Sequence, residues 1–440
     1  MKKVFVFLTL AALLASLTVV VSAATPAPGG PFSSSFRVQN LGSSSAGCTV
    51  TYYDSTGAVG ATSTLPSIAV GDSAYVYVPS VSGLADGMYS AVVACDQEVA
   101  AVVNYSDSDS GASFSGVGSD DAATTLYAPG VYNNYYSYYS NIVVQNTTSA
   151  PIDITVSIYA PGSSTPVATQ SKTSVPAYAS ASFEQEGLSG LSTNIAYSAK
   201  VVGTGNIAAV VNIYGKGGVG AQLYSYNPFA SGSTTAYAPV IMNAYYGYNT
   251  SLTIQNLTTT STSCTVTYGT GHNQSTSVAG NSSVALYTPG SPVPAGTLTG
   301  AKVVCGQNVV VLVNESNSYN RAASYSGFAT GATTVRAPIV MRRYYQYNTS
   351  ITCQNIGSSA ATMTIQYGGV SGSNTSPGIS VNGTHLFYQP TDSLLSDNWI
   401  GSATITSAQD IVCIVNEDQN EGAKATTSMD QLYAYNGIGE

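Results

Sequence analysis

A tyrosine-rich phrase that occurs three times constrains the fold of this chain more than any other feature. It reads YAPGVYNNYYSYYSNIVVQN at 127–146, YAPVIMNAYYGYNTSLTIQN at 237–256 and RAPIVMRRYYQYNTSITCQN at 336–355. In every copy seventeen positions separate the Pro of Ala-Pro from the Asn of Gln-Asn. Self-similarity at a fixed spacing is typical of a tandem array of structural units.

A second phrase, a run of small and β-branched residues that ends in Asn, sets the period. Its four copies read EVAAVVN, NIAAVVN, NVVVLVN and DIVCIVN, and they end at Asn104, Asn212, Asn314 and Asn416. The steps of 108, 102 and 102 residues indicate four units, each large enough to own a core. The expected unit boundaries are 24–123, 124–233, 234–333 and 334–440.

Each unit reads as short strands separated by Gly, Pro, Ser and Asn clusters, and no helical period appears after the first residues. The first unit contains SFRVQN, CTVTYYD, SAYVYVP, YSAVVAC, EVAAVVNY and ASFSG. A tight turn is expected between the fourth and fifth of these, at 95–97 and again at 306–308. The pattern predicts an all-β fold of four tandem immunoglobulin-like antiparallel β-sandwich domains. The only Trp, Trp399, lies in a predicted loop, so the strand topology stays open.

Residues 1–23 are expected to be a secretory signal peptide. Lys2 and Lys3 precede an apolar run at 4–21, and the small residues at 21–23 fit a cleavage site. A retained membrane anchor is the less favoured alternative, because the run is short for a membrane span. The processed chain is therefore expected outside the cytoplasm, secreted or at the cell surface.

The charge of the chain excludes some partners. Removal of the leader leaves 10 basic and 21 acidic side chains, a net charge near −11, which disfavours nucleic acid and anionic membranes. Only 8% of residues are charged, and Ser, Thr, Asn, Gly and Tyr take their place. We expect covalently attached glycan to help keep such a surface soluble.

The six cysteines predict three disulfides. Cys48 and Cys264 are equivalent in the repeat, as are Cys95 and Cys305, and both positions lack Cys in the second and fourth units. Joint presence and joint absence predict the bonds Cys48–Cys95 and Cys264–Cys305, which leaves Cys353–Cys413 as the third. Zinc binding is the rival interpretation, but the spacings do not fit it. Disulfides are typical of an oxidising, extracytoplasmic location.

The Tyr-rich inserts are expected to pack at domain junctions, where aromatic rings can bury area while their hydroxyls stay hydrated. A loop lying on its own sandwich is the alternative. The first unit lacks the insert, because its Pro28 lies only 12 residues before Asn40. The candidate interface residues are Tyr135, Tyr136, Tyr138, Tyr245, Tyr246, Tyr248, Tyr344, Tyr345 and Tyr347.

The two ends of the chain suggest self-association. The last unit stops at QLYAYNGIGE, which aligns with the internal QLYSYNPFASGSTTAYAP, and ATPAPGG at 24–30 resembles the missing continuation. Two copies set end to end would recreate the internal linker and form an open, head-to-tail homopolymer. Addition of the N-terminal segment as a strand to a neighbouring sandwich is a second route to self-association. A monomeric rod of four domains is the simpler alternative.

Asn-x-Ser/Thr sequons supply the glycosylation candidates. Those that recur in register are Asn146 and Asn256, in the Gln-Asn phrase, and Asn249 and Asn348, beside the Tyr insert. The other candidates are Asn104, Asn273, Asn281, Asn314, Asn374 and Asn382. The loop NYSDSDSG also offers Asn104, Asp107 and Asp109 as calcium ligands, although a solvated acidic hairpin is the favoured interpretation.

No catalytic pattern is found, so we expect no enzyme and no cofactor. There is no G-x-S-x-G motif, and the only histidines, His272 and His385, fall at unrelated places in different units. The bare glycine pattern GKGGVG at 215–220 joins two predicted strands rather than opening a helix, so it is interpreted as a hairpin loop.

The recurring Ala-Pro, Tyr-Tyr, Asn-Thr and Gln-Asn elements, followed by VVNE-like strands, resemble the secreted tandem β-sandwich repeat proteins of environmental bacteria, some of which build glycosylated extracellular fibrils. The resemblance covers about 25–440 and implies a helical filament of subunits joined end to end beneath a glycan coat. The expected function is therefore a structural subunit of a secreted filament. The alternative is a carbohydrate-binding or adhesive rod at the cell surface.

Overall fold

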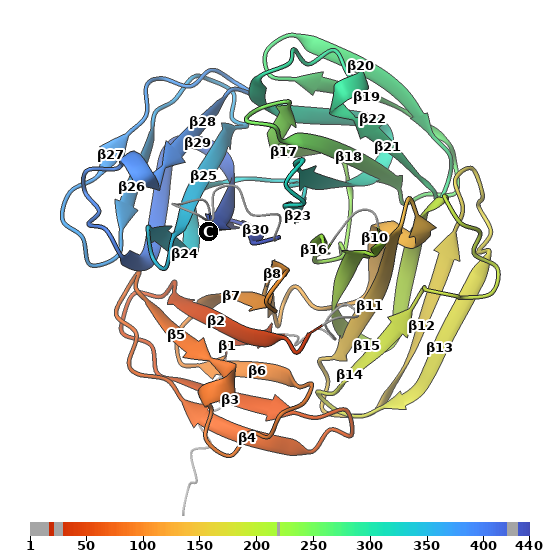
Figure 1. Ribbon diagram of the computed structural model, residues 1–440, viewed down its shortest axis with the longest axis horizontal. Coiled ribbons are helices and arrows are strands. Elements are labelled where there is room, and N and C mark those ends of the chain that lie inside the picture. Colours follow the sequence, from red (N-terminus) through yellow and green to blue (C-terminus); the bar gives the residue numbers. More distant parts are fainter. Residues whose placement is uncertain (1–16, 22–29, 218–220, 420–429) are drawn as a thin grey trace, which may run out of the picture.

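The computed structural model describes residues 17–21, 30–217, 221–419 and 430–440, with only the backbone described for 17–21. Within these ranges the chain is almost entirely β, arranged in several sheets with short 3-10 turns and no α-helix. Correspondingly, no helix in the described part could cross a membrane. The expected all-β class is confirmed. Figure 1 shows four lobes arranged around a central axis.

Lobe 1, residues 30–122 together with 17–21, contains two sheets with the strand orders β4-β3-β6-β1-β9 and β5-β2-β7-β8. Its elements are β1 (Leu17–Val21), β2 (Ser33–Asn40), β3 (Cys48–Tyr53), β4 (Val59–Thr64), β5 (Ser73–Tyr77), η1 (Val78–Ser80), β6 (Ser90–Cys95), β7 (Val99–Ser106), β8 (Gly111–Ser115) and β9 (Val117–Gly118). Lobe 2 begins at residue 123 and contains β10 (Ala123–Tyr135), β11 (Tyr138–Asn146), β12 (Ile152–Tyr159), β13 (Ala168–Val175), β14 (Ser180–Glu184), β15 (Ala196–Gly215) and β16 (Leu223–Tyr226).

Lobes 3 and 4 repeat the same order of strands. Lobe 3 contains β17 (Ser233–Asn243), β18 (Asn249–Asn256), β19 (Thr262–Tyr268), β20 (His272–Val278), β21 (Ser283–Tyr287), η3 (Thr288–Gly290), β22 (Thr297–Ser316) and β23 (Ala322–Ser326). Lobe 4 contains β24 (Ala332–Arg342), β25 (Tyr347–Asn355), β26 (Met363–Tyr367), β27 (Asn374–Thr375), β28 (Thr384–Tyr388), η4 (Gln389–Thr391), β29 (Trp399–Gln419), β30 (Leu432–Asn436) and β31 (Ile438–Gly439).

In each of lobes 2, 3 and 4, one long strand takes part in both sheet layers. The first half of β15 pairs with β10 and β12, whereas its second half pairs with β11 and β16. The tight turn expected from the sequence breaks the strand only in lobe 1, between β6 and β7. In lobe 3 that prediction is wrong, because β22 continues through 306–308 and keeps its backbone pairing on both sides.

Alternating burial explains why these sequences form half-buried strands. Along β12 the side chains of Ile152, Ile154, Val156 and Ile158 are buried, while the residues between them face outward. A fully buried Val or Ile stabilises the fold by roughly 1.5–3 kcal/mol relative to leaving it exposed. Four large buried clusters, each centred on one lobe, give the molecule a separate core in each repeat.

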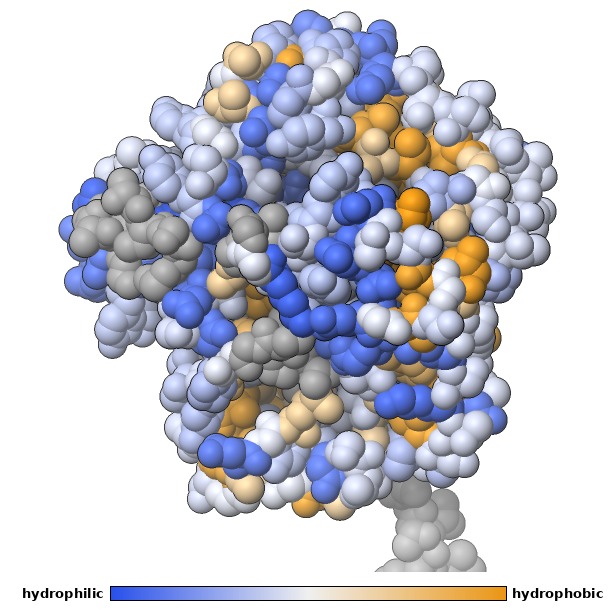
Figure 2. Space-filling model, turned by 45° about the vertical axis from the view of Figure 1, so that its right-hand side comes forward, coloured by the Kyte–Doolittle hydropathy of each residue, from blue (hydrophilic) through white to orange (hydrophobic). Residues whose placement is uncertain are grey.

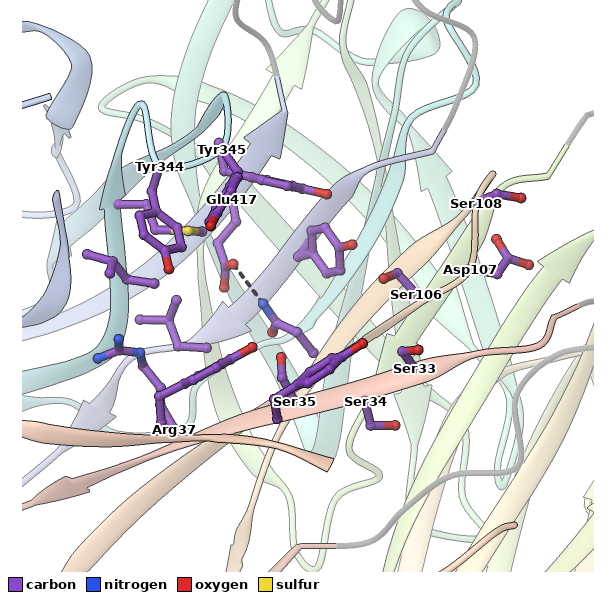
Figure 3. A pocket seen from close by; sticks show the side chains of 18 of the residues that line it. Ser33, Ser34, Ser35, Arg37, Ser106, Asp107, Ser108, Tyr344, Tyr345 and Glu417 are labelled. Atoms are coloured by element: carbon purple, nitrogen blue, oxygen red, sulfur yellow. Dashed lines mark hydrogen bonds between the residues drawn. The ribbon is translucent and has the colours of Figure 1, made fainter. Parts of the chain in front are cut away.

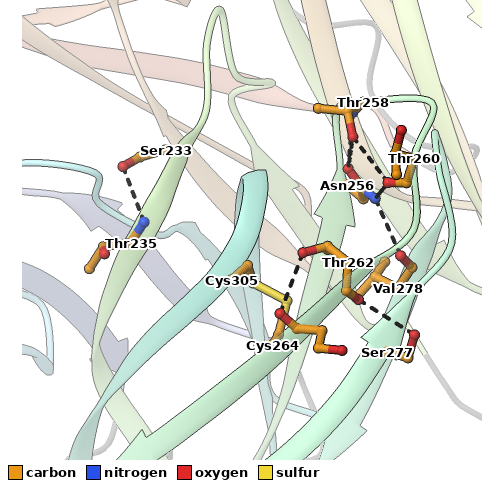
Figure 4. Close-up of a disulfide and its surroundings, with 11 residues drawn as sticks. Ser233, Thr235, Asn256, Thr258, Thr260, Thr262, Cys264, Ser277, Val278 and Cys305 are labelled. Carbon is orange, nitrogen blue, oxygen red and sulfur yellow. Dashed lines mark hydrogen bonds between the residues drawn. A yellow bond between two sulfur atoms is a disulfide. The ribbon is translucent and has the colours of Figure 1, made fainter.

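All three predicted disulfides are confirmed. Cys48 pairs with Cys95, Cys264 with Cys305 and Cys353 with Cys413, and the Cα atoms of the pairs lie 4.2, 4.1 and 4.0 Å apart. The first two bonds cross-link neighbouring strands of one sheet, as Figure 4 shows for Cys264 and Cys305. The third joins β25 to β29, in the sheet nearer the axis.

The four lobes close into a ring within one chain. One short strand of each lobe, β8, β16, β23 or β30, lies at the centre of Figure 1, and each contacts two of the other three. Serine hydroxyls also link neighbouring lobes, because Ser90 donates to the Tyr178 carbonyl of lobe 2 and Ser198 donates to the Asn281 carbonyl of lobe 3. Ser402 of lobe 4 then donates to Gly71 of lobe 1 over 2.8 Å. The first and last lobes, which the sequence suggested would join separate molecules, are neighbours here.

Lobe 1 differs from the others in the origin of its first strand. In lobe 3, β17 pairs with β22 and places Ala236 opposite Val303. In lobe 1 the equivalent position between β6 and β9 is held by β1, which places Val19 opposite Val93. Residues 17–21 thus form a strand of lobe 1, although the sequence assigns them to the leader. We call this place between β6 and β9 the first-strand position.

Candidate functional site

The Asn anchors that set the repeat period lie at the junctions between lobes. Asn212 of lobe 2 accepts a hydrogen bond from the Tyr105 hydroxyl of lobe 1 over 2.7 Å. At two other junctions the partner is a carboxylate: Asn416 Nδ2 donates to Glu315 Oε2 over 2.6 Å, and Asn104 Nδ2 donates to Glu417 Oε2 over 2.8 Å. In each case the residue that directly follows one Asn anchor bonds to the Asn anchor of the next lobe around the ring. For Glu417 of lobe 4, that next lobe is lobe 1.

Two of these junctions open into clefts. Cleft A lies between lobes 4 and 1, has a volume of about 580 Å³ and contains Glu417, Asn104, Arg37, Tyr344 and Tyr345 in its lining. Figure 3 shows the two tyrosines on one side, the row Ser33, Ser34 and Ser35 on the other, and Glu417 between them. Its volume falls within the range of ligand pockets, which measure roughly 300–1,000 Å³.

Cleft B lies between lobes 3 and 4 and has a volume of about 480 Å³. Its lining includes Glu315, Asn416, Tyr245, Tyr246 and Tyr248. The Tyr248 hydroxyl donates to Asp418 Oδ2 over 3.1 Å, and Arg321 forms a mostly buried ion pair with the same carboxylate. Clefts A and B are therefore two versions of one site, each with lobe 4 on one side.

Burial makes the cleft carboxyls weak acids. Desolvation raises the pKa of Glu417 to about 8, opposed by the hydrogen bond from Asn104 and by the charge of Arg37. Desolvation likewise raises the pKa of Glu315 to about 8, opposed by the hydrogen bond from Asn416. Both side chains are therefore largely protonated near neutral pH and can donate a hydrogen bond.

The Tyr inserts of lobes 3 and 4 line the clefts, whereas that of lobe 2 lines neither cleft, although its local contacts are similar. Tyr344, Tyr345 and Tyr347 line cleft A, and Tyr245, Tyr246 and Tyr248 line cleft B, so each of these inserts faces the next lobe around the ring. In lobe 2, Tyr135 stacks on Tyr132, and the Tyr138 hydroxyl bonds to Gln222 of its own lobe. Tyr136 is 66% exposed.

Asp430, which the sequence analysis did not select, joins all four lobes at the axis. Its carboxylate accepts hydrogen bonds from the Leu223 amide of lobe 2 over 2.6 Å and from the Ala322 amide of lobe 3 over 2.7 Å. Its own amide donates to the Asp109 carbonyl of lobe 1 over 2.8 Å. The side chain is fully buried, and this desolvation raises the pKa of Asp430 well above its usual range, against the hydrogen bonds from Leu223 and Ala322.

The glycosylation candidates that recur in register have structural roles, and this corrects the interpretation of their recurrence. Asn256 is fully buried, and its Nδ2 donates to the Thr260 and Val278 carbonyls, as drawn in Figure 4. Asn146 is buried in the same way, and its Nδ2 donates to the Ala150 carbonyl. An Nδ2 atom enclosed like this cannot carry a glycan in the folded chain.

The remaining sequons differ in exposure. Asn249 and Asn348 accept hydrogen bonds from the Ala244 and Arg343 amides and so close the Tyr turns. Asn104 and Asn314 lie near the axis, whereas Asn281, Asn374 and Asn382 are half-buried. Asn273 is exposed on β20, where its Oδ1 accepts from the Thr267 hydroxyl. Of the ten candidates it is the best placed for modification.

The predicted calcium ligands do not converge. Asn104 donates to Glu417, and Asp107 Oδ1 accepts from the Asp109 and Ser110 amides, which closes a turn. The residues described by the structure contain no group of three or more His, Cys, Asp or Glu side chains that could hold a metal ion. The Asp107 side chain of this loop closes the hairpin turn itself.

The sequence contained a signal for the cleft carboxyls that was not used. Asn314 and Asn416 are each followed by Glu, whereas Tyr105 and Ile213 follow the other two anchors. The recurring phrase indicates a strand, and the residue after it, which differs between the repeats, supplies the carboxyl in lobes 3 and 4. Asp430 has a weaker signal, because strand pairing aligns it with an acid, Asp109, only in lobe 1, and with Ala221 and Asn320 in lobes 2 and 3.

Comparison with known proteins identifies no family. No family model matches the chain, and no curated protein matches it. Thermotoga maritima 1070, a solved structure, is 15% identical over 25% of this chain and 95% of its own, with a TM-score of 0.22. A Bacteroides ovatus protein of a mixed-linkage glucan utilization locus, solved with a mixed-linkage heptasaccharide, is 9% identical over 90% of this chain and 99% of its own, with a TM-score of 0.12. At these TM-scores neither likeness assigns a fold or a function.

Proposed function

We propose that this protein is a structural subunit of a secreted extracellular filament, built from four immunoglobulin-like sandwich domains and without catalytic activity. One observation carries the proposal. The first-strand position of lobe 1 is held by residues 17–21, which belong to the segment expected to be removed as a leader. Removal of residues 1–23 leaves that position open in every processed copy.

An open strand position favours the addition of another strand. Ala91 and Val93 of β6 are buried, and β9 flanks the other side of the position. Unpaired strand edges bind extended segments through main-chain hydrogen bonds. A processed lobe 1 is thus suited to receive a strand from a second copy.

The proposed donor is the segment Ala24–Pro28 of the neighbouring copy. In lobes 2, 3 and 4 the Ala of Ala-Pro pairs with a buried Ala: Ala128 with Ala199, Ala238 with Ala301 and Ala337 with Ala403. The segment contains Ala27-Pro28, and the equivalent buried residue in lobe 1 is Ala91.

Chain length favours a donor from a different copy. Ten residues separate Ala238 from Asn249 in lobe 3, but only five separate Ala27 from Ser33, the equivalent of Asn249. Ala27 of a neighbouring copy can reach the first-strand position without having to span this short connection within the same lobe. If each copy donates to the next, the contact is heterologous and produces an open filament.

The test combines electron microscopy with a designed cross-link. Ala27→Cys and Ala91→Cys are introduced together into the secreted protein, which is oxidised and run on a non-reducing gel. We expect filaments in the microscope and a ladder of cross-linked multimers on the gel. The single variant Ala27→Cys is the matched control, because it can form at most a dimer.

Three results would contradict the proposal. A cross-link confined to single chains would place the segment in its own lobe, and a cross-linked dimer without larger products would indicate reciprocal exchange. Discrete rings in the microscope, with no fibres, would exclude polymerisation. The mass of the intact secreted chain tests the glycan coat separately, since attached sugar raises it above the polypeptide mass.

The three disulfides support an extracytoplasmic location for this subunit, because such bonds persist in oxidising compartments. The surface fits the same setting. On the face drawn in Figure 2, hydrophilic and pale residues surround smaller hydrophobic patches, and only 8% of all residues carry charge.

A further inference from the structure

Clefts A and B share buried polar atoms that no protein group satisfies. Glu417 is 1% exposed, and its Oε1 has no hydrogen-bond partner, nor does Oδ1 of Asn104 beside it. In cleft B, Oε1 of the fully buried Glu315 and Oδ1 of Asn416 also have no hydrogen-bond partner. Leaving a buried polar group unpaired costs about 1–3 kcal/mol. The same unpaired polar atoms occur at two equivalent places, and this repetition indicates a site built for a ligand.

The unpaired atoms define what the ligand must offer. A protonated Glu417 presents a donor, and Asn104 Oδ1 presents an acceptor, at the same end of cleft A. Cleft B presents the same combination through Glu315 and Asn416. A hydroxyl group can both donate and accept, so neighbouring hydroxyls satisfy such a pair.

The charges in each cleft balance. In cleft B, Arg321 is paired with Asp418. In cleft A, Arg37 and Asp107 carry opposite charges, and the carboxyl between the two lobes is held neutral by burial. Neither an anion nor a cation gains a net partner, and an uncharged polar ligand loses least on leaving water.

Exposed aromatic rings form one wall of each cleft. Tyr345 is 73% exposed and Tyr246 is 84% exposed. Each meets the preceding tyrosine edge to face, with ring centroids 4.8 Å apart, so the orientation is the same in both clefts. Rings fixed in this way offer an apolar surface beside the hydrogen-bonding groups, and covering it is favourable.

We infer that clefts A and B each bind an uncharged oligosaccharide, with Tyr345 or Tyr246 against the C–H face of a sugar ring and the Glu–Asn pair bonded to its hydroxyls. The site does not depend on polymerisation, since both clefts lie within one chain. In a filament it would hold polysaccharide at regular intervals.

The test is calorimetric titration of the secreted protein with neutral hexasaccharides, namely cellohexaose, xylohexaose, mannohexaose and maltohexaose, and with an acidic oligogalacturonate. We expect at least one neutral sugar to bind at two sites per chain and the acidic sugar not to bind. Tyr345→Ala and Tyr246→Ala should each remove one site, and the double variant should remove both.

Tyr136→Ala is the matched control, because it removes an equally exposed insert tyrosine from lobe 2 that lines neither cleft. The three tyrosines are largely exposed, so the variants are expected to keep the fold, which a thermal melt checks. Absence of binding by all four neutral sugars would overturn the inference. So would binding that survives the double variant, or preference for the acidic sugar.

Discussion

Lobe 1 and the other three lobes share a sequence pattern but differ in how the first strand is supplied. In lobes 2, 3 and 4 the strand belongs to the lobe's own repeat, and a tyrosine hydroxyl fixes it from inside. Tyr226, Tyr325 and Tyr435 each bond to both the amide and the carbonyl of one residue on that strand, which is Gly130, Val240 or Ile339. Lobe 1 has Phe114 at the equivalent place, opposite Val103.

The missing hydroxyl shows that lobe 1 is adapted to a different first strand. Strand pairing aligns Phe114 with Tyr325 and Tyr435, because Val103, Val313 and Val415 are their equivalent partners. A buried tyrosine there would need a backbone partner that lobe 1 does not supply from its repeat. Closed lobes fix their own strand, whereas lobe 1 depends on a segment from outside the repeat.

The largest effect is expected at the axis, where the Asp430 side chain bonds to lobes 2 and 3 while its backbone amide bonds to lobe 1. Asp430→Ala removes the acceptor of two buried amides, Leu223 and Ala322, and should lower the free energy of unfolding by roughly 2–6 kcal/mol. Calorimetry should show a lower melting temperature. Asp120→Ala, at an exposed acid, is the control. Equal melting of both variants would mean that Asp430 does not hold the lobes together.

The next effect is a dependence of stability on pH. It is expected from the two junctions beside lobe 4, which contain a Glu, and not from the junction between lobes 1 and 2. Glu315 and Glu417 have folded-state pKa values of about 8, above the ordinary value of 4.5. The folded chain therefore binds more protons than the unfolded chain between these values, and stability falls as pH rises from about 4.5 to 8. Melting temperatures measured across this range should decline.

The double variant Glu315→Gln and Glu417→Gln identifies the source of this decline. Its amides cannot ionise, so its melting temperature should depend less on pH than that of the parent chain. Replacing Tyr105 by Phe at the neutral junction is the control and should leave the slope unchanged, because the Tyr105 hydroxyl is not ionised in this range. A rise in stability toward pH 8 would contradict both assignments.

A smaller effect tests the comparison of lobes directly. Tyr325→Phe and Tyr435→Phe remove hydroxyls that bond to the first strand, and each should cost about 1–3 kcal/mol. Phe114→Tyr makes the reverse change in lobe 1 and should not stabilise the processed monomer, since the open first-strand position gives its hydroxyl no backbone partner. Urea unfolding measures all three. A stabilising Phe114→Tyr would indicate that lobe 1 holds its own strand after all.

The sequence predicted what depends on local pattern. Repeat spacing predicted four units, and the joint presence of Cys48 with Cys95 and of Cys264 with Cys305 predicted two of the disulfides. Ring closure depends instead on contacts between residues some three hundred positions apart, such as Asn104 with Glu417, which no local pattern encodes. The Gln-Asn phrase recurs for a structural reason that the sequence also indicates, because Asn40 and Asn355 occupy the same place without a sequon.

The smallest effect concerns the exposed sequon, and it contrasts with the buried ones. Asn273 lies on the surface of β20, so Asn273→Gln should change the free energy of unfolding by less than about 0.5 kcal/mol. Asn256→Gln should cost far more, because Asn256 Nδ2 bonds to two carbonyls in the interior. Intact mass of the secreted variants then separates structure from modification. If the host attaches glycan to Asn, the mass should fall for Asn273→Gln, whereas a loss confined to Asn256→Gln would contradict the buried position of Asn256.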